Sequence, residues 1–490
     1  MDNIDDLNHK WKRILLIKPN YRAVGWDFYN MNFPPINLSY IASYTSDLDV
    51  EIDILDAKVK NLSIQQIKRK IQTFNPDLVG ISVYVSAAIN LSNQIAEIVK
   101  EVEPNITVVL GGRHPTFESE ECLENEYVDI IVRGEGEITF RELLINGGPE
   151  GVDGISFKKH HDIIHNPERK LMSKEQYAEI RFPSRHLVKK NKYKMFTVRL
   201  ETVETSRGCP YSCKFCTTWK VNNGKWRARP IKNVIEELRI ISENKAITDI
   251  FFVDDELTAN TKRVEDLCES IIKSKKAGFI NDFKFFAQIR VDDIVRSSKM
   301  IEKMAEAGFW VVFIGIESVD EASLKEMRKG ITFNHVLKAL DILHENNILA
   351  IGNLIIGVNL NDTRDDIIRN IQIMKEVDID IISFVILTPF PGSDTLEEMD
   401  KKGLVLTKNW SKYTVMEPVI RTNQLSPADL YELLFYSFHE LKYILDIRKL
   451  LGRVRKSRGL KFLLNPKRMI SAIKSFFAVR AYINGYNFLT

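Results

Sequence analysis

The chain has 490 residues, of which 44% are hydrophobic, and its formal net charge is only +3. This balance excludes a protein that binds polyanions over its whole surface, and 5 cysteines in such a length exclude a disulfide framework. No apolar run is long enough to predict a transmembrane helix, and the polar, acidic N-terminus does not resemble a signal peptide. We therefore expect a cytoplasmic, multidomain globular protein.

Short β-branched runs alternate with amphipathic helical patterns over residues 10–148. The expected strands cover 13–17, 50–55, 78–83, 107–110 and 129–132, and the clearest helices cover 63–74 and 87–103. This alternation predicts a parallel, doubly wound, Rossmann-like sheet. Ligands of such sheets bind beyond the carboxyl ends of the strands, where the glycines of this region gather.

Four segments at these strand ends resemble, in order, the cobalamin-binding domain that precedes many radical S-adenosylmethionine (SAM) cores. They are residues 34–40, 80–82, 111–116 and 133–137. The nucleotide tail of cobalamin must slide between strand ends, where any Cβ would block a close approach of the backbone. The resemblance implies cobalamin contacts at Ser82, Gly111, Gly112, Gly134 and Glu135.

The loop at residues 19–26 lacks the Asp-x-His-x-x-Gly motif whose histidine ligates cobalt from below in corrinoid proteins of the methionine-synthase type. We therefore expect cobalamin without a histidine from this loop. His114 is a possible substitute ligand, but a turn histidine satisfied by backbone groups is the alternative interpretation. A domain that kept the fold and lost the corrinoid also stays open.

Residues 149–195 are predicted as a linker that contains a small hairpin. Glycine and proline at 147–151 break the preceding pattern, and two strand-like runs follow at 154–157 and 161–165. His160, His161 and His165 are interpreted as solvated hairpin residues and not as a metal site.

The most informative residues are Cys209, Cys213 and Cys216, which are spaced C-x3-C-x2-C on one loop. Three thiolates can hold three irons of a 4Fe-4S cluster and leave one iron open. A structural zinc site would require a fourth Cys or His nearby, and none follows within twenty residues. Cys122 and Cys268 lie in helix-like segments and are interpreted as core residues.

This loop resembles that of the radical SAM enzymes. In that family the open iron chelates the amino and carboxylate groups of SAM, and electron transfer cleaves the cofactor to a 5'-deoxyadenosyl radical. The resemblance implies that Phe215 lies against the adenine. It also implies that six strand–helix units over residues 196–400 form a partial (β/α)6 TIM-type barrel, with its chemistry at the carboxyl ends of the strands.

Further SAM contacts are implied at the ends of the second, third and fourth barrel strands. Asp254, Asp255 and Glu256 match the segment that receives the methionine amino group, although Asp is also favoured at helix N-caps. The other implied residues are Gln288, Arg290, Glu317 and Ser318. An inward Arg290 needs a partner, which is either the methionine carboxylate or Asp292. Glu317 and Ser318 fit ribose or methionine contacts.

Residues 401–490 are predicted as a helical, basic C-terminal segment. Between 448 and 480 there are eleven Lys or Arg and no Asp or Glu, interleaved with apolar residues. This pattern is typical of a helix on an anionic membrane surface. The alternative is a helix docked on the barrel with a solvated basic face. No recognised RNA module is present, and no nucleic-acid partner is expected.

The resemblance covers about residues 10 to 400 and is close to the class that includes anaerobic magnesium-protoporphyrin ester cyclases and hopanoid methylases. It implies an enzyme that uses a 4Fe-4S cluster, SAM and cobalamin to methylate an unactivated carbon, and the basic tail suggests a lipid or isoprenoid substrate at the inner face of the membrane. A one-electron donor such as flavodoxin or ferredoxin is implied as partner. The alternatives are a radical cyclase or C–C bond-forming enzyme on a lipid or tetrapyrrole, and a corrinoid or redox sensor without turnover.

Overall fold

The structure is a computed structural model that describes residues 10–21, 31–160, 162–195, 198–444, 447–459 and 462. These residues divide into two compact units. The first unit contains residues 10–21, 34–192 and 409–411, and the second contains residues 31–33, 193–408 and the described residues from 412 onward.

The first unit is built on a seven-stranded sheet in the order β2-β1-β3-β4-β5-β6-β7. Strands β1 to β5 are parallel, as the alternation of strands and helices predicts. The predicted hairpin forms β6 and β7, which continue the sheet in antiparallel pairing. The strands are β1 (Arg13–Lys18), β2 (Glu51–Asp56), β3 (Leu78–Ser82), β4 (Thr107–Gly111), β5 (Ile130–Val132), β6 (Ile155–Lys159) and β7 (Asp162–His165).

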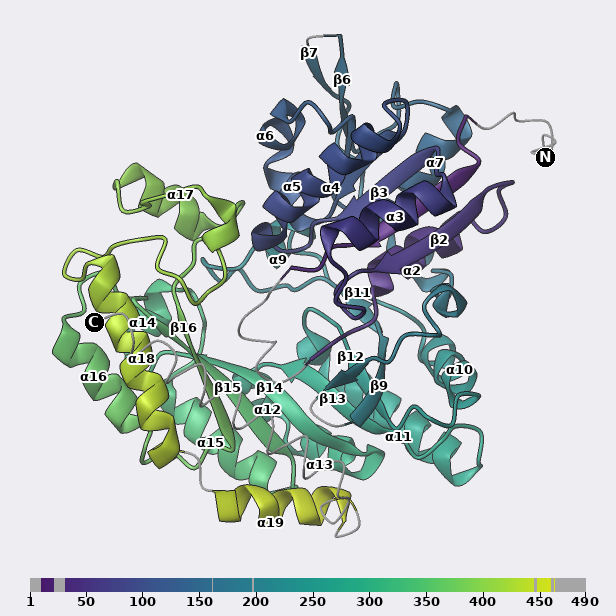
Figure 1. Ribbon diagram of the computed structural model, residues 1–490. Coiled ribbons are helices and arrows are strands. Elements are labelled where there is room, and N and C mark those ends of the chain that lie inside the picture. The colour runs from purple at the N-terminus through teal and green to yellow at the C-terminus, as the bar shows by residue number, and fades with distance from the viewer. Residues whose placement is uncertain are drawn as a thin grey trace. The chain divides into compact units, whose positions relative to one another are not determined.

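Helices cover this sheet, and Figure 1 shows them in purple to blue. Helix α3 packs beside α4 and α2 packs beside α7, which gives the two helical layers of a doubly wound sheet. Ser63 caps α3, because its hydroxyl accepts from the Gln66 amide while the Gln66 side chain accepts from the Ser63 amide. The helices are α2 (Ile36–Tyr44), α3 (Ile64–Phe74), η2 (Ser86–Ala88), α4 (Ile89–Val102), α5 (Arg113–Phe117), α6 (Ser119–Glu124), α7 (Gly136–Asn146), α8 (Lys174–Ala178) and η3 (Arg185–Leu187).

The second unit contains a seven-stranded sheet in the order β16-β15-β14-β13-β12-β9-β8. All its strands run parallel except the short β8, and β8 and β16 remain as edges, so the sheet is a half-barrel that does not close on itself. Its strands are β8 (Lys194–Met195), β9 (Val198–Val203), β12 (Asp249–Phe252), β13 (Lys284–Ile289), β14 (Phe309–Glu317), β15 (Leu349–Ile356) and β16 (Ile381–Ile386). The first strand that leads to the cysteine loop, β9, ends at Val203, and Ser206 and Arg207 form the separate β10 (Ser206–Arg207), which pairs with β11 (Arg227–Ala228).

Helices follow the strands of the half-barrel, as the teal and green ribbons of Figure 1 show. They are α9 (Thr218–Val221), α10 (Ile231–Ser242), η4 (Leu257–Ala259), α11 (Thr261–Lys276), α12 (Val291–Arg296), α13 (Ser298–Ala307), α14 (Glu321–Glu326), α15 (Phe333–Glu345), α16 (Arg364–Ile373) and α17 (Asp394–Lys401). After them come η5 (Trp410–Lys412), α18 (Pro427–Ile444) and α19 (Ile447–Arg458). No described helix is long and apolar enough to cross a membrane.

An aromatic core fills one end of the half-barrel. Phe251, Phe286 and Phe313 come from three neighbouring strands and pack in one cluster with Trp310. Leu450 and Val454 of α19 and the neighbouring Phe462 pack against the same cluster. The first part of the basic segment predicted at 448–480 is therefore a docked helix, and residues 460, 461 and 463–480 lie outside the described part of the chain.

Ion pairs hold α19 to the strands. The guanidinium of Arg458 donates to both carboxylate oxygens of Asp249, over 2.9 and 3.1 Å, at the start of β12. Arg453 bridges Asp378 and Asp380, over 2.6 and 2.7 Å, just before β16. Because both strands begin at these carboxylates, α19 covers the amino end of the half-barrel and leaves its carboxyl end to the functional residues.

Candidate active site

The three-cysteine loop leaves the short β10–β11 ladder at a glycine. Gly208 has φ +93°, and a Cβ added there would lie 2.1 Å from the carbonyl oxygen of Lys225. Any other residue would thus collide with the backbone and also meet left-handed strain. The Asp255 carboxylate accepts a hydrogen bond from the Gly208 amide at 3.1 Å. This bond links the start of the loop to the end of β12.

The cysteines of this loop are all free thiols, with Cys213 buried and Cys209 and Cys216 half-buried. Burial raises the pKa of Cys209 to about 12. It also raises the pKa of Cys213, although the charges of Lys329 and Arg290 act in the opposite direction. As thiolates these groups require a strong positive partner, which bound iron supplies.

Among the described residues, no three His, Cys, Asp or Glu side chains converge tightly enough to hold a single metal ion. Ligands of a 4Fe-4S cluster each bind a different iron, so their sulfurs stand farther apart than the ligands of one ion. Three thiols on a glycine-pinned loop fit the three protein-held irons of a 4Fe-4S cluster, whereas a structural zinc site would need a fourth ligand.

The acidic triplet after β12 divides into different environments. Asp254 is fully buried and accepts from the Thr205 amide, the Thr205 hydroxyl and the Ser206 hydroxyl, so it ties β12 to the cluster loop. Asp255 holds the Gly208 amide. The predicted N-cap role falls to Glu256, whose carboxylate accepts from the Thr258 amide at 2.9 Å.

Glu256 has the most informative titration of the three. Burial, assisted by the charge of the neighbouring Asp293, raises its pKa to about 7 against the opposing effect of the hydrogen bonds from Thr258. The Thr258 hydroxyl lies 2.5 Å from Glu256 and 2.8 Å from Asp293, so one hydroxyl joins two buried carboxylates. Such a pair of acids favours a positively charged ligand group.

The strands β13 and β14 bring the remaining predicted residues to the carboxyl end of the half-barrel. Gln288 lies two residues after Phe286 of the aromatic core, so both side chains point to the same face of β13. Gln288 is exposed, as expected for a side chain that faces the open interior of the half-barrel. Arg290 is buried and pairs with Asp292 at 2.8 Å, which is the second of the two partners that the sequence left open. Ser318 is also buried, and its hydroxyl accepts from the Asp320 amide.

Lys329 is a candidate site residue that sequence reasoning missed. Its ammonium lies 2.6 Å from the Glu317 carboxylate, with both side chains almost completely buried, and 5.9 Å from the ring centroid of Phe215. Glu317 itself adopts φ +62°, a backbone conformation that is strained for this residue. The segment Met327-Arg328-Lys329-Gly330 after α14 carried no local signal, because a lysine there reads as an ordinary surface residue.

A small cavity of about 30 Å³ adjoins Phe215. Val358 and Leu360 line it from the loop after β15, and Leu387 lines it from the end of β16. These are the last two strand ends of the half-barrel.

The first unit presents its own set of predicted residues at strand ends. Gly111 ends β4, and a Cβ added there would make only ordinary contacts, 3.6 Å from the Val132 oxygen. Gly112 has φ +118°, and its Cβ would lie 2.6 Å from the Val83 oxygen, so this position requires glycine. Gly134 has φ +70° and open space around it.

The other predicted residues of this edge carry polar links. Ser82 accepts from the Asn37 amide group over 2.8 Å, which joins β3 to α2. The Glu135 carboxylate accepts from the Met172 amide at 2.9 Å. The edge thus offers small residues beside polar groups that already have partners.

His114 is buried, and its Nδ1 lies 3.0 Å from the Ser86 hydroxyl. Its ring meets that of Trp410 edge-on with centroids 5.4 Å apart. The partner of this histidine is therefore a side chain and not the backbone groups that we expected, and burial lowers its pKa to about 4. Its other ring nitrogen, Nε2, is buried and has no hydrogen-bond partner among the described residues.

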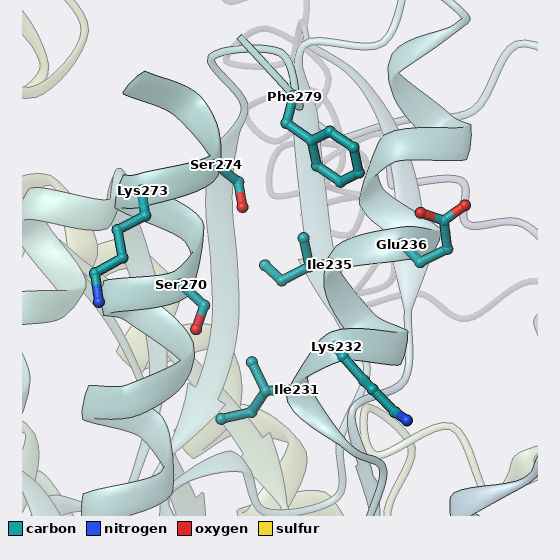
Figure 2. A pocket seen from close by; sticks show the side chains of 8 residues that line it. All are labelled: Ile231, Lys232, Ile235, Glu236, Ser270, Lys273, Ser274 and Phe279. Atoms are coloured by element: carbon teal, nitrogen blue, oxygen red, sulfur yellow. The ribbon is translucent and has the colours of Figure 1, made fainter. Parts of the chain in front are cut away.

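A groove of about 580 Å³ lies elsewhere on the second unit, between α10 and α11. Figure 2 shows Ile231, Ile235 and Phe279 along it, with Lys232 and Lys273 at its sides. None of its lining residues belongs to the predicted site.

Comparison with known proteins agrees with this geometry. The B12 binding domain family matches residues 29–144, and the Radical SAM superfamily matches residues 203–369. The chain is 34% identical to an uncharacterized methyltransferase of Pyrococcus horikoshii, over 87% of this chain and 91% of that protein. It is 27% identical to the anaerobic magnesium-protoporphyrin IX monomethyl ester cyclase of Rubrivivax gelatinosus, over 86% of this chain and 75% of that protein.

Solved structures show the same fold. The radical SAM methyltransferase TsrM from Kitasatospora setae, with cobalamin and a 4Fe-4S cluster bound, aligns with a TM-score of 0.68 and 16% identity over 89% of this chain and 90% of that chain. The cobalamin-dependent SAM radical enzyme OxsB, with aqua-cobalamin and SAM bound, aligns with a TM-score of 0.69 and 19% identity over 97% of this chain and 75% of that chain.

The resemblance inferred from the cysteine loop and the glycine-ended strands is thus confirmed, and so are the three cofactors that it implied. The chain belongs to the radical SAM enzymes that carry an N-terminal B12-binding domain, and its cofactors are a 4Fe-4S cluster, SAM and cobalamin.

Proposed function

We propose that this enzyme removes hydrogen from an unactivated carbon of a lipid or isoprenoid and replaces it with a methyl group. The observation that carries the proposal is the presence, in one chain, of a cluster loop and a glycine-lined cobalamin edge. When bound, the cluster and SAM supply a carbon-centred radical and cobalamin supplies a methyl group. A hydrocarbon C–H bond resists acid–base chemistry, which is why a radical route suits such a substrate.

Cys209, Cys213 and Cys216 would hold the cluster. Phe215 would lie against the adenine of SAM. Glu256, which is buried beside a second carboxylate, is suited to the cationic amino group, while Asp254 and Asp255 position the cluster loop beside it.

The remaining groups of SAM would meet β14 and the loop after α14. Glu317 and Ser318 are suited to the ribose hydroxyls, and Gln288 faces the open interior where a substrate would lie. Lys329 is a buried cation at the same place, and its bond to Glu317 uses one of the three N–H donors of the ammonium, so it is suited to the carboxylate. Arg290 already has a carboxylate partner in Asp292.

In the first unit, Gly111, Gly112 and Gly134 would let the nucleotide tail of cobalamin approach the backbone. Ser82 and Glu135 would contribute polar contacts at the same strand ends. Because the loop at residues 19–26 has no Asp-x-His motif and His114 is enclosed, we propose that no protein histidine ligates cobalt.

The choice of a lipid draws on the relatives and on the basic tail. The chain is 24% identical to the hopanoid C-3 methylase of Methylococcus capsulatus, over 82% of this chain and 75% of that protein. The outer face of α19 exposes Arg448, Lys449, Leu451, Arg455 and Lys456. We propose that this face contacts anionic lipid at the inner side of the membrane, where each basic residue near the surface contributes about 1 kcal/mol.

The alternative product is a new ring or C–C bond without net methylation, as the similarity to magnesium-protoporphyrin cyclases allows. The deciding experiment uses reconstituted, reduced enzyme with SAM, methylcobalamin and a lipid extract of the host. Release of 5'-deoxyadenosine with a product heavier by one CH2 supports methylation. Release of 5'-deoxyadenosine with a product of unchanged carbon count supports cyclisation, and absence of both supports a sensor.

The membrane contact has a separate test. The double variant Arg455→Glu/Lys456→Glu reverses charge on the exposed face of α19 and leaves Arg453 and Arg458 in their ion pairs. It should co-sediment less with vesicles containing anionic lipid, and added salt should reduce the difference. The matched control Lys232→Glu/Lys273→Glu makes the same charge change at the groove of Figure 2. Equal loss in both variants, or in neither, rejects this face as the contact.

The one-electron donor is proposed to be a flavodoxin or ferredoxin. Reduction of the purified enzyme by each candidate protein, followed by its 5'-deoxyadenosine yield, identifies which of them can serve. If only a chemical reductant is effective, neither class of protein is the donor.

A further inference from the structure

Arg290 makes a different contact with each of its nitrogen atoms. Nε donates to Asp292 at 2.8 Å and Nη2 donates to the carbonyl oxygen of Lys329 at 2.7 Å. Nη1 lies 4.0 Å from Sγ of Cys213, within the longer reach of a hydrogen bond to sulfur. The guanidinium carbon also lies 3.6 Å from the ring centroid of Tyr211.

A bidentate grip on a carboxylate uses two neighbouring nitrogens of the guanidinium. The edge that includes Nε is closed, because the single hydrogen of Nε is donated to Asp292. On the other edge, Nη1 already contacts Sγ of Cys213 and Nη2 already donates to the carbonyl oxygen of Lys329. The side chain is only 7% exposed, so displacing a partner would leave a buried polar group unsatisfied. The role of SAM carboxylate ligand therefore does not suit Arg290.

The partners come from separate parts of the second unit. Tyr211 and Cys213 belong to the cluster loop, Asp292 lies in the first turn of α12, and Lys329 follows α14. Arg290 itself follows β13 directly and is the residue before α12. Its position is thus fixed by packing and hydrogen bonds, so its charge cannot move away from Cys213 when the charge of the loop changes.

We propose that Arg290 is a positioning residue that raises the reduction potential of the cluster through the sulfur of Cys213. One-electron reduction, by the external donor, adds negative charge to the cluster and its thiolate ligands. A fixed cation that donates to one of these sulfurs stabilises the reduced state more than the oxidised state. Asp292 offsets the charge only in part, because it binds the Nε side and its side chain is 23% exposed to screening water.

The inference depends on the cluster but not on the proposed substrate, so it is tested without substrate. Anaerobically reconstituted wild type, Arg290→Gln and Arg290→Lys are titrated against ambient potential, with the reduced cluster followed by electron paramagnetic resonance. At the wild-type midpoint the ratio of reduced to oxidised cluster should fall about tenfold in Arg290→Gln, which is a 59 mV decrease for one electron. Arg290→Lys, which keeps the charge but not the fork, should lie between the two.

A second variant predicts a change of opposite sign. Asp292→Asn keeps the arginine and removes its countercharge, so the midpoint should rise. Arg296→Gln is the matched control, because Arg296 lies on α12 with 53% of its side chain exposed and pairs with Asp293. Its midpoint should remain that of the wild type.

Iron content and SAM affinity separate this role from the others. The proposal expects four irons per chain and a SAM dissociation constant within threefold of wild type in Arg290→Gln. An unchanged midpoint with a tenfold weaker SAM affinity would overturn it in favour of a carboxylate ligand. If Arg290→Gln fails to hold its iron, the sign of the shift in Asp292→Asn decides, and a midpoint that does not rise there rejects the proposal.

Discussion

The carboxyl ends of the two sheets differ in the kind of residue that they present. The edge of the first unit consists of glycines and small polar residues whose hydrogen bonds are already satisfied. The edge of the second unit concentrates buried charge, with Glu317 facing Lys329, Arg290 facing Asp292 and Glu256 beside Asp293. A large preformed cofactor needs space against the backbone, whereas a cofactor that is cleaved in place needs charges that orient its parts.

Loss of a cluster ligand should have the largest effect, because it removes the centre of the charged edge. Cys213→Ala should lose reconstituted iron and abolish 5'-deoxyadenosine formation under reducing conditions. Cys268→Ala, at a buried thiol of α11, is the control and should keep both. SAM cleavage by the triple alanine variant of Cys209, Cys213 and Cys216 would show that the charged edge does not house the cluster.

Substitutions at two adjacent glycines test whether the edge of the first unit binds cobalamin because it lacks side chains there. The structure has room for a methyl group at Gly111, so Gly111→Ala should keep the melting temperature of the cobalamin-free protein but weaken hydroxocobalamin binding by at least about tenfold. Gly112→Ala should instead destabilise the protein itself, because its Cβ would lie 2.6 Å from the Val83 oxygen at φ +118°. Thermal melts and equilibrium dialysis separate the two effects. If Gly111→Ala binds cobalamin normally, Gly111 is not a contact.

The Arg458–Asp249 ion pair allows the contribution of a buried charge to stability to be measured away from the carboxyl end of the half-barrel. Both side chains are almost completely buried, so Arg458→Met should destabilise the second unit by about 3–5 kcal/mol by leaving Asp249 unpaired. The double variant Arg458→Met/Asp249→Asn should recover most of this loss. Urea unfolding of the anaerobic protein measures both. A double variant no better than the single one would mean that α19 contributes packing and not charge compensation.

Glu256 gives the smallest expected effect, which depends on pH. Its folded pKa of about 7 lies above the usual 4.5, so the folded state retains the proton longer than the unfolded state. Stability from this group therefore falls as pH rises from about 4.5 to 7. Glu256→Gln should gain stability relative to wild type across this window, by at most about 3 kcal/mol, and the difference should be constant above pH 7. Thermal melts of the cluster-free protein at pH 5, 6, 7 and 8 test the prediction, and a flat difference would mean that burial does not control this carboxyl.

The features predicted correctly from sequence are those that local pattern determines. The alternation of strands and helices predicted both sheets, and the cysteine spacing predicted the cluster, because each signal lies within a few consecutive residues. Lys329 was missed because it joins Glu317 only through the fold, twelve residues along the chain. Arg290 shows an intermediate case, since its alternation predicted an inward side chain but not whether Asp292 or a ligand would be its partner.

Trp410 has a consequence for how the protein is made. This residue is almost completely buried in the first unit, where its indole nitrogen donates to Glu121 at 2.6 Å and its ring meets His114. Residues 409–411 thus complete a unit whose other residues are all translated by position 192. During synthesis the first unit must wait for more than two hundred further residues before this side chain arrives. The N-terminal unit therefore stays incomplete while the half-barrel is translated. By the time the cobalamin domain is complete, the cluster loop at residues 209–216 has already been synthesised.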